Sequence, residues 1–489
     1  MFKSGIFVML ITLVSRVLGL ARSVVVAYYF GASAGTDAFF SAFKISNFFR
    51  QLLGEGALGT SFIPLYNEKV GKEGEEEGKK FIFSILNIVF IFSVIVSVGM
   101  IIFSDEIIAV IVNGFSDETK IIASDLLKIM SCYFIFISLA GMIGAILNNF
   151  KCFAVPASTS IFFNLAILGG AIFFGKTYGI KAMAYGVLFG GFLQLVIVLP
   201  QFFKRAGIYR LKIDFKDVYI KRIFYLMLPM LVGIVARQFN TIVDQFFASY
   251  LETGGVSALE NATRIYNLPI GVFGISISTV IYPALSKKIV NKDFEAVEED
   301  IKKGLNILLF LVVPSTIVLT VYATDVVRLI FEYGQFSKRA VEITSDSLLY
   351  YSLGLYFYTA IHLMTRAFYG MKNSRDPVKF SILSIAINII LNMLFIKTLQ
   401  YKGLALSTSI AAMVNFSLLL HTFRKKYINM NLNHVGIFLL KVLGSSFAAV
   451  LASFYIKNII LKLVVFSAVY MAFWGYTLYK KKLEVFWWE

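Results

Sequence analysis

Charged residues are scarce in this chain of 489 residues: they make up 15% of it, whereas 58% are hydrophobic. Soluble domains carry about 25% charged residues, so this is not the composition of an ordinary globular protein. Only two cysteines and eight prolines are present. These counts exclude a disulfide-rich scaffold, a coiled coil and a disordered chain. With a mean hydropathy of +0.77, the composition indicates a membrane protein.

The few cysteines and histidines leave little room for the usual catalytic chemistry. Cys132 and Cys152 would lie about 30 Å apart on a continuous helix, which excludes a disulfide bond between them. The three histidines, His362, His421 and His434, lack the spacing of a metal-binding helix. No GxSxG, HExxH or P-loop motif occurs. We therefore expect neither an enzyme nor a pump with its own ATP-hydrolysing domain.

Long apolar runs recur from one end of the chain to the other. Unbroken runs of about 20 residues predict an all-α polytopic membrane protein and disfavour a β-barrel, whose strands alternate over about 10 residues. They predict about fourteen transmembrane helices. The predicted spans are residues 4–30, 36–63, 81–104, 121–149, 154–175, 181–203, 222–250, 256–285, 304–324, 342–370, 378–398, 403–423, 434–456 and 459–479.

Lysine and arginine gather in alternate loops between these spans. The clusters lie at residues 204–222, 287–303, 424–426 and 480–482. Because cytoplasmic loops retain lysine and arginine, both chain termini are predicted to be cytoplasmic. This topology explains most of the net charge of +17, with contact to anionic lipids as a secondary effect. A nucleic-acid partner is not needed to explain the charge.

An internal repeat relates the two halves of the sequence. Residues 42–47, Ala-Phe-Lys-Ile-Ser-Asn, match residues 262–267, Ala-Thr-Arg-Ile-Tyr-Asn, 220 positions later. The match falls in the second span of each half, which predicts a parallel repeat of six helices. Two six-helix lobes, residues 1–215 and 216–426, would enclose a central cavity, as in transporters. The last two helices, within residues 427–489, lie outside the repeat.

Charged side chains inside the spans concentrate on the first two helices of each repeat. They are Arg16, Arg22, Asp37, Lys44, Arg50, Glu55, Arg237, Asp244 and Arg264. A charge at mid-bilayer costs roughly 2.5–3.5 kcal/mol, so these groups must face protein or a watery cavity. The guanidinium fork of arginine matches phosphate oxygens, so such a cavity suits an anionic, phosphate-bearing substrate. Snorkelling or salt-bridged structural arginines are the alternative interpretation.

Two smaller patterns accompany these charges. Asn47 lies three residues before Arg50 and therefore on the same helix face. Asn388 and Asn392 share a face of the eleventh span, and Thr408 lies in the twelfth. Together with Asp244, these oxygens form a candidate site for a monovalent cation such as sodium. Interhelical hydrogen bonds are the alternative role for this second set.

Five segments of the sequence form a distinctive set: residues 15–22 (Ser-Arg-Val-Leu-Gly-Leu-Ala-Arg), 37–40, 47–50, 262–269 and 331–336. In these segments the sequence resembles the MurJ/MviN lipid II flippase family. It implies a multidrug/oligosaccharidyl-lipid/polysaccharide exporter fold in the bacterial cytoplasmic membrane. The implied substrate is lipid II, the undecaprenyl-pyrophosphate-linked precursor of peptidoglycan.

The resemblance also assigns expected roles to residues. Arg22, Arg50 and Arg264 match the family's cavity arginines, which implies that they hold the pyrophosphate. We expect their neighbours, Arg16, Asp37, Lys44, Asn47 and Glu55, to belong to the same substrate site. Asp244, Asn388, Asn392 and Thr408 match a sodium site of similar proteins. A groove beside the last two helices would accommodate the polyprenyl tail.

The leading hypothesis is a lipid II flippase that works by alternating access in cell wall biogenesis. The alternatives are a flippase for another polyprenyl-pyrophosphate-linked oligosaccharide of the O-antigen type, and a cation-coupled drug antiporter. An antiporter for cationic drugs would be expected to line its cavity with acids rather than arginines. A membrane scaffold that recruits cell-wall enzymes would not need buried arginines. A non-transporting receptor is a further alternative that no feature of the sequence supports. Lipid II and membrane lipids are the expected partners, a monomer is the default, and no cofactor beyond sodium is implied.

Overall fold

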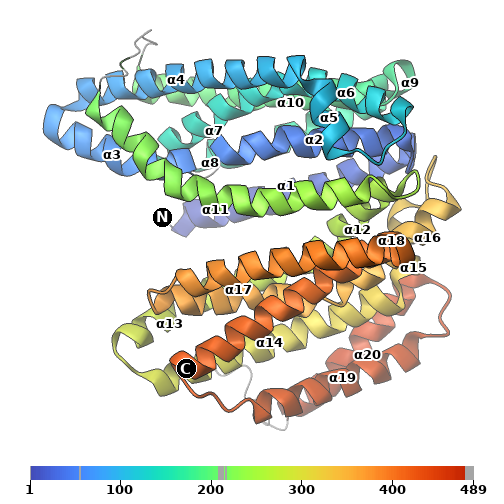
Figure 1. Ribbon diagram of the computed structural model, residues 1–489. Helices are drawn as coiled ribbons and strands as arrows, with labels where there is room; N and C mark the ends of the chain where they lie inside the picture. Colours follow the sequence, from blue (N-terminus) through green and yellow to red (C-terminus); the bar gives the residue numbers. More distant parts are fainter. Residues whose placement is uncertain (1, 54–56, 208–213, 215–216, 480–489) are drawn as a thin grey trace. The chain divides into compact units, whose positions relative to one another are not determined.

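The structure, a computed structural model, describes residues 2–53, 57–207, 214 and 217–479 (Figure 1). These residues form helices and connecting turns without any β-strand, which confirms the all-α prediction. The chain divides into two compact units. Unit 1 contains Met1–Ser257 with Tyr333–Ser337, and unit 2 contains Ala258–Glu332 with Lys338–Glu489. The predicted lobe boundaries at residues 215 and 426 stay predictions.

The helices of unit 1 follow most of the first seven predicted spans, but the helix Ala57–Glu73 continues ten residues beyond the end of the span predicted at 36–63. They are α1 (Phe2–Phe30), α2 (Ala34–Leu53), α3 (Ala57–Glu73), α4 (Glu75–Ile102), α5 (Ser104–Ile111), α6 (Asp117–Ser131), α7 (Tyr133–Asn149), α8 (Ala154–Gly169), the π-helical segment η1 (Gly170–Phe174), α9 (Gly175–Tyr178), α10 (Lys181–Ala206) and α11 (Val218–Ala248). The short α5 lies outside the predicted spans, and the span at 121–149 is divided at Cys132. Helix α8 packs between α1 and α10.

Unit 2 also consists of helices joined by short turns. Its helices are α12 (Gly255–Pro269, whose first residues belong to unit 1), the π-helical η2 (Ile270–Gly274), α13 (Ile275–Val290), α14 (Phe294–Val321), α15 (Ala323–Phe331), α16 (Lys338–Ser352), α17 (Leu355–Gly370), α18 (Arg375–Lys426), α19 (Asn433–Ser453) and α20 (Ile459–Tyr479). Within the described part of the chain, nine helices are long and apolar enough to cross a membrane. The count of fourteen spans stays a prediction.

The backbone supports the duplication that the sequence motif indicates. Helices α4 and α14 both have 28 residues and begin 219 positions apart, and α6 and α16 both have 15 residues. Lys151 and Lys372, 221 positions apart, both have positive φ, at 61° and 57°. Gly179 (φ 57°) corresponds at the same offset to Gln400 (φ 48°), which divides the long α18 into two helices. A break that a glycine makes in the first copy is therefore retained by glutamine in the second.

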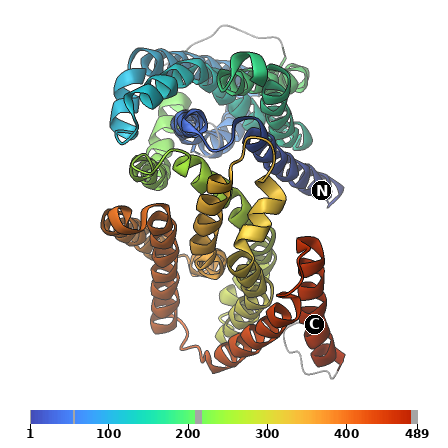
Figure 2. The ribbon, with the colours of Figure 1, turned by 90° about the vertical axis from the view of Figure 1, so that its right-hand side faces the viewer.

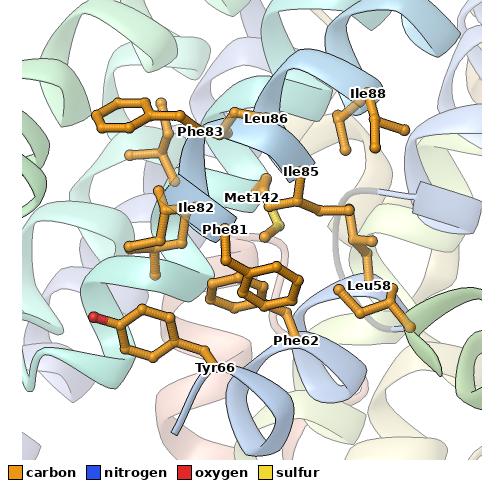
Figure 3. Close-up of a cluster of buried hydrophobic side chains, with 14 of the residues drawn as sticks. Leu58, Phe62, Tyr66, Phe81, Ile82, Phe83, Ile85, Leu86, Ile88 and Met142 are labelled. Carbon is orange, nitrogen blue, oxygen red and sulfur yellow. The ribbon is translucent and has the colours of Figure 1, made fainter. Parts of the chain in front are cut away.

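The aromatic core of unit 1 joins α3, α4 and α7 (Figure 3). Phe62 and Phe81 are fully buried and stack with their ring centroids 5.5 Å apart, and Tyr66 stacks on the other side of Phe62. Tyr219, at the start of α11, completes the cluster against Phe81. Close packing, rather than release of water, drives helix association inside a bilayer. The cluster therefore attaches α11 to the first unit.

Ion pairs fix the same end of α11. The buried Lys69 ammonium lies 3.0 Å from Asp217, whose side chain also accepts a hydrogen bond from the Tyr219 backbone at the N-terminus of α11. Arg222 donates to Glu68 over 3.0 Å, and this hydrogen bond is the main reason why the pKa of Glu68 falls to about 2. Glu68 consequently stays ionised throughout the physiological pH range.

The last two helices pack against each other and against α14 (Figure 2). Tyr470 donates to the Phe310 carbonyl over 2.7 Å, and the indole of Trp474 donates to Ser445 over 3.1 Å. The buried Lys462 pairs with Asp325 at 2.5 Å. Buried polar groups thus have partners where α20 meets its neighbours, as hydrocarbon surroundings require. The predicted tail groove beside α19 and α20 stays a prediction.

The segment Tyr333–Ser337 lies with unit 1, although it is far from that unit in sequence. The Gln335 backbone N–H donates to the Tyr28 carbonyl over 2.9 Å at the end of α1. Gly31 and Gly334 both have positive φ, at 62° and 61°, where the two backbones meet. A Cβ on Gly31 would lie 2.5 Å from the Gln335 carbonyl oxygen, and one on Gly334 would collide with the Tyr28 carbonyl. Only glycine allows so close an approach.

Three glycine-to-alanine variants should separate backbone strain from steric overlap at this contact. Gly334→Ala should lower the apparent melting temperature most, because it adds a collision to a left-handed strain of about 1–2 kcal/mol. Gly179→Ala has a positive φ of 57° but open space around the new methyl group, so it should show the strain alone. Gly99→Ala, in a helix and open space, should be neutral or slightly stabilising. Equal melting temperatures for all three purified variants would contradict this account.

Candidate functional site

The three arginines expected to bind the substrate are divided between the units. Arg22 lies on α1 in unit 1 and is only 9% exposed. Arg50, on α2 of the same unit, donates from Nε to the Asn47 side-chain oxygen over 2.5 Å. The predicted common face of Asn47 and Arg50 is therefore confirmed. Arg264 lies on α12 in unit 2.

Arg264 is held by its own helix. Its Nη2 atom forms a 2.9 Å ion pair with Glu260, one turn earlier on α12. Its Nε atom is buried and has no hydrogen-bond partner among the described residues. A buried guanidinium N–H without an acceptor is costly, so this donor is suited to an incoming oxygen ligand. The glutamate orients the guanidinium while this N–H stays uncommitted.

The other charged candidates differ in their surroundings. Arg16, on α1, is exposed, whereas Lys44 on α2 is half-buried. Glu55 lies outside the described residues, and so does the side chain of Arg237. The exposure of Arg16 is compatible with a place in a watery cavity and with snorkelling.

Asp37 occupies the most elaborate polar contact of the candidate site. Its carboxylate accepts hydrogen bonds from the backbone N–H groups of Gly254 and Ser257, over 2.6 and 2.8 Å, and from the Ser257 hydroxyl over 2.6 Å. The side chain is 3% exposed. A carboxylate at this position satisfies unpaired N–H groups at the start of α12 and complements the positive end of the helix dipole. In this structure Asp37 therefore anchors the helix that carries Arg264.

Neighbouring hydroxyls and amides extend this anchor. The Ser257 hydroxyl lies 2.8 Å from the Thr36 hydroxyl oxygen. The side-chain amide of Gln245, near the end of α11, donates to the Ser41 hydroxyl over 2.8 Å. Sequence reasoning placed Asp37 with the substrate and did not find this cap. The cap joins residues 220 positions apart, and no local pattern in the sequence indicates such a contact. Contact of Asp37 with substrate stays a prediction.

The oxygen-rich set expected to bind a cation is partly assembled within unit 2. The Asn388 amide donates to the Thr408 hydroxyl over 3.4 Å, and the Asn392 amide donates to the Asn388 oxygen over 3.2 Å. These bonds join the two halves of α18 on either side of Gln400. They also fit the alternative of interhelical hydrogen bonds. Asp244 lies on α11 in unit 1, where it accepts from Asn240 over 3.1 Å.

The chemistry available to this set of residues is binding rather than bond-breaking. Within the part of the chain that the structure describes, no group of three or more histidine, cysteine or acidic side chains could hold a metal ion. The buried groups singled out above are arginines, amides, hydroxyls and a capped carboxylate. Guanidinium groups bind phosphate oxygens through paired hydrogen bonds. The site therefore has the donors that an anionic ligand requires.

Duplicated helical halves that carry arginines within their apolar spans are typical of a class of membrane transporter. The fold matches that of an inward-facing multidrug resistance MATE family transporter of the MOP superfamily, with a TM-score of 0.73 over 86% of this chain and 97% of that chain. The two sequences are only 15% identical, so this likeness establishes the fold alone.

Closer similarity identifies the family within this class. The family model "Lipid II flippase MurJ" matches residues 26–473. A solved structure of lipid II flippase MurJ in an inward closed conformation is 31% identical, with a TM-score of 0.85 over 97% of this chain and 99% of that chain. The probable lipid II flippase MurJ of Buchnera aphidicola subsp. Schizaphis graminum is 34% identical over 93% of this chain and 90% of its own length. The probable lipid II flippase MurJ of Vibrio cholerae serotype O1 is 35% identical over 86% of this chain and 82% of its own length. The chain belongs to the lipid II flippase MurJ family.

Asp37 variants should test the anchoring of α12. Asp37→Ala should destabilise the protein by about 0.5–2 kcal/mol, the usual cost of losing a helix cap. Asp37→Asn keeps an acceptor oxygen, so it should lie between wild type and alanine. Ser257→Ala, which removes only the hydroxyl donor, should have the smallest effect. The measurement is thermal unfolding of the three purified variants, and no loss of stability in Asp37→Ala would contradict a role as helix cap.

Proposed function

We propose that this protein moves lipid II from the inner to the outer leaflet of the bacterial cytoplasmic membrane during peptidoglycan synthesis. The observation that carries the proposal is the match to lipid II flippase MurJ proteins over nearly the whole chain, at about one-third identity. Transport of this kind transfers a lipid without making or breaking its bonds. The protein is accordingly a transporter rather than an enzyme.

The proposed ligand of the arginines is the pyrophosphate of the substrate. Arg22 is buried on α1, Arg50 is oriented by Asn47, and Arg264 keeps a buried Nε donor available beside its ion pair with Glu260. Three guanidinium groups would complement a doubly charged, oxygen-rich headgroup. Arg16, Asp37, Lys44, Asn47 and Glu55 are proposed as the surroundings of this site. One chain holds both repeats, so a monomer is the proposed working unit.

Alternating access would follow from this arrangement of charge. Like charges repel one another, so a doubly charged pyrophosphate bound between the arginines would favour the conformation that brings them together. A substrate shifts a conformational equilibrium only through its different affinity for the two states. Binding energy from the headgroup would in this way be coupled to the change of access across the membrane.

Arginine variants should separate pyrophosphate binding from structural charge. Arg22→Ala, Arg50→Ala and Arg264→Ala should each abolish lipid II translocation, since loss of one partner of a buried charge pair costs about 2–5 kcal/mol. Lysine at these positions should restore activity only in part, because it lacks the bidentate fork. The measurement is lipid II exposed at the cell surface after depletion of the host's own flippase.

The control for this series is Arg339→Ala. Arg339 is exposed and pairs with Glu342 at the start of α16, so its loss should leave translocation unchanged. Membrane levels of every variant are measured in parallel. Normal translocation in all three alanine variants at normal expression would overturn the pyrophosphate-binding proposal.

A sodium ion is the proposed coupling ion. Asn388, Asn392 and Thr408 supply amide and hydroxyl groups in unit 2, and Asp244 is the one carboxylate among the four proposed ligands. A site of this composition would attract a monovalent cation mainly through the charge of Asp244. Such an ion would influence transport only by binding one conformation more tightly than the other.

Removing the charge of Asp244 should abolish any response to sodium. In wild type, a conformational probe should report a difference between sodium and potassium buffers, and Asp244→Asn should remove it. Asp346→Asn is the matched control, because Asp346 pairs with Lys402 at the protein surface. If the wild type itself behaves identically in both salts, the amide and hydroxyl cluster is structural, and direction must come from membrane potential or substrate supply.

The proposed orientation places both termini in the cytoplasm, on the strength of the lysine and arginine distribution. Single cysteines at Lys292 and Lys425 should react with an impermeant maleimide only in inverted membrane vesicles, and a cysteine at Lys176 only in intact cells. All three native side chains are exposed, and Cys132 and Cys152 are first replaced by serine. Surface labelling at Lys292 in intact cells would refute this topology.

A further inference from the structure

Helices α8 and α10 of unit 1 enclose a groove that none of the proposed transport residues lines. It has a volume of about 660 Å³, within the range of about 300–1,000 Å³ typical of small-molecule sites. Gly169, Phe173, Tyr178, Tyr185, Gly186 and Phe189 are prominent in its lining. We call it the α8–α10 groove. Phe173, Tyr185 and Phe189 are at least half exposed, so the groove opens on the outside of the unit.

The local sequence explains why the groove exists. Gly170 and Gly186 have no room for a side chain: a Cβ on Gly170 would lie 2.8 Å from the Ala182 carbonyl oxygen, and one on Gly186 would lie 2.9 Å from the Ile167 Cα. The two backbones therefore cross closely and form a floor. Residues 170–174 are π-helical, so Phe173, within this segment, is displaced from the α-helical register. Phe173 contributes to one wall above the floor, and Tyr185 and Phe189 of α10 contribute to the other.

The second copy of the repeat lacks this construction. At an offset of 221, the offset shared by Gly179 and Gln400, Gly170 corresponds to Leu391 and Gly186 to Ser407. Tyr178, Tyr185 and Phe189 correspond to Leu399, Leu406 and Ile410. The described part of α18 contains no π-helical segment. The groove is therefore not a necessary consequence of the repeated fold but a feature of the first copy.

The membrane surroundings limit what can occupy the groove. Its walls are almost entirely apolar, so water would lack the two to four polar partners that hold it in a cavity. An empty groove would forfeit dispersion contacts along its lining. Both helices lie in candidate membrane spans, and hydrocarbon chains surround such spans. A lipid chain is the one component that is both apolar and abundant there.

We infer that the α8–α10 groove binds a single acyl chain of a bilayer phospholipid. Bulk lipid is as apolar as the groove, so selective retention comes from close fit between the aromatic walls rather than from hydrophobicity. The concentration of phospholipid around the protein is high, so even weak selectivity gives high occupancy. Because α8 also packs on α1, the helix that carries Arg22, a bound chain would stabilise the support of that arginine. The inference depends on membrane insertion and not on the identity of the transported lipid.

Photocrosslinking tests this inference on the full chain. The purified protein is placed in liposomes that contain phosphatidylglycerol with a diazirine on one acyl chain, and the labelled peptides are mapped by mass spectrometry. In wild type, labelling should concentrate on residues 165–193. Gly169→Leu should reduce that labelling about tenfold, a change of about 1.4 kcal/mol, because the new side chain fills the groove. Its Cβ would meet only the Phe173 ring, at 3.8 Å, so the helix crossing should remain intact.

Gly99→Leu is the matched control, since Gly99 lies on α4 with nothing within 4 Å of an added Cβ. It should leave labelling of residues 165–193 unchanged. Labelling of α19 provides an internal reference for folding and insertion, because a misfolded variant would change there as well. Three results would overturn the inference: labelling spread evenly over exposed apolar residues such as Phe447, equal labelling of Gly169→Leu and wild type, or displacement of the label by equimolar polyprenyl phosphate, which would identify a polyprenyl chain as the occupant.

Discussion

A polar or charged group within an apolar span is costly unless the protein supplies a partner, and much of the structure depends on this constraint. The Asp37 carboxylate illustrates it, since three donors from Gly254 and Ser257 surround a side chain that is almost completely buried. An isolated carboxylate in hydrocarbon would be too costly to retain. The same requirement explains the pairing of Lys462 with Asp325 and of Arg264 with Glu260. In these three cases helix geometry brings a complementary group to the buried charge.

The duplicated architecture allows one copy to specialise while the other retains the common frame. Helix lengths and positive-φ positions recur between the halves, which shows that backbone geometry tolerates extensive change in side chains. Gly179 and Gln400 make the same break with different residues, and the second carries the strain of a left-handed glutamine. Between such fixed points the copies diverge. The first has the π-helical segment and an aromatic groove, whereas the second has the amide and hydroxyl cluster of Asn388, Asn392 and Thr408.

Membership of the lipid II flippase MurJ family explains why the arginines are supported by neighbouring side chains. A transporter must bind a charged headgroup without trapping it, so its cations need support that does not neutralise them completely. Glu260 pairs with one edge of Arg264 while the Nε donor remains buried without a partner among the described residues. Asn47 orients Arg50 without neutralising its charge. The pairing with Glu260 therefore leaves the Nε donor of Arg264 ready for an anion and limits the cost of burying this side chain.

The sequence by itself determined the all-helical membrane fold, the positions of most helices and the duplication, because hydropathy and spacing depend on local residue order. It also placed Arg50 and Asn47 on one face, since that relation lies within a single turn. The tertiary structure alone decided the role of Asp37 as the cap of α12, the attachment of residues 333–337 to α1 and the groove between α8 and α10. Each of these depends on how backbones distant in sequence approach one another. Periodicity identifies the face that a residue occupies, but not the atoms that this face will meet.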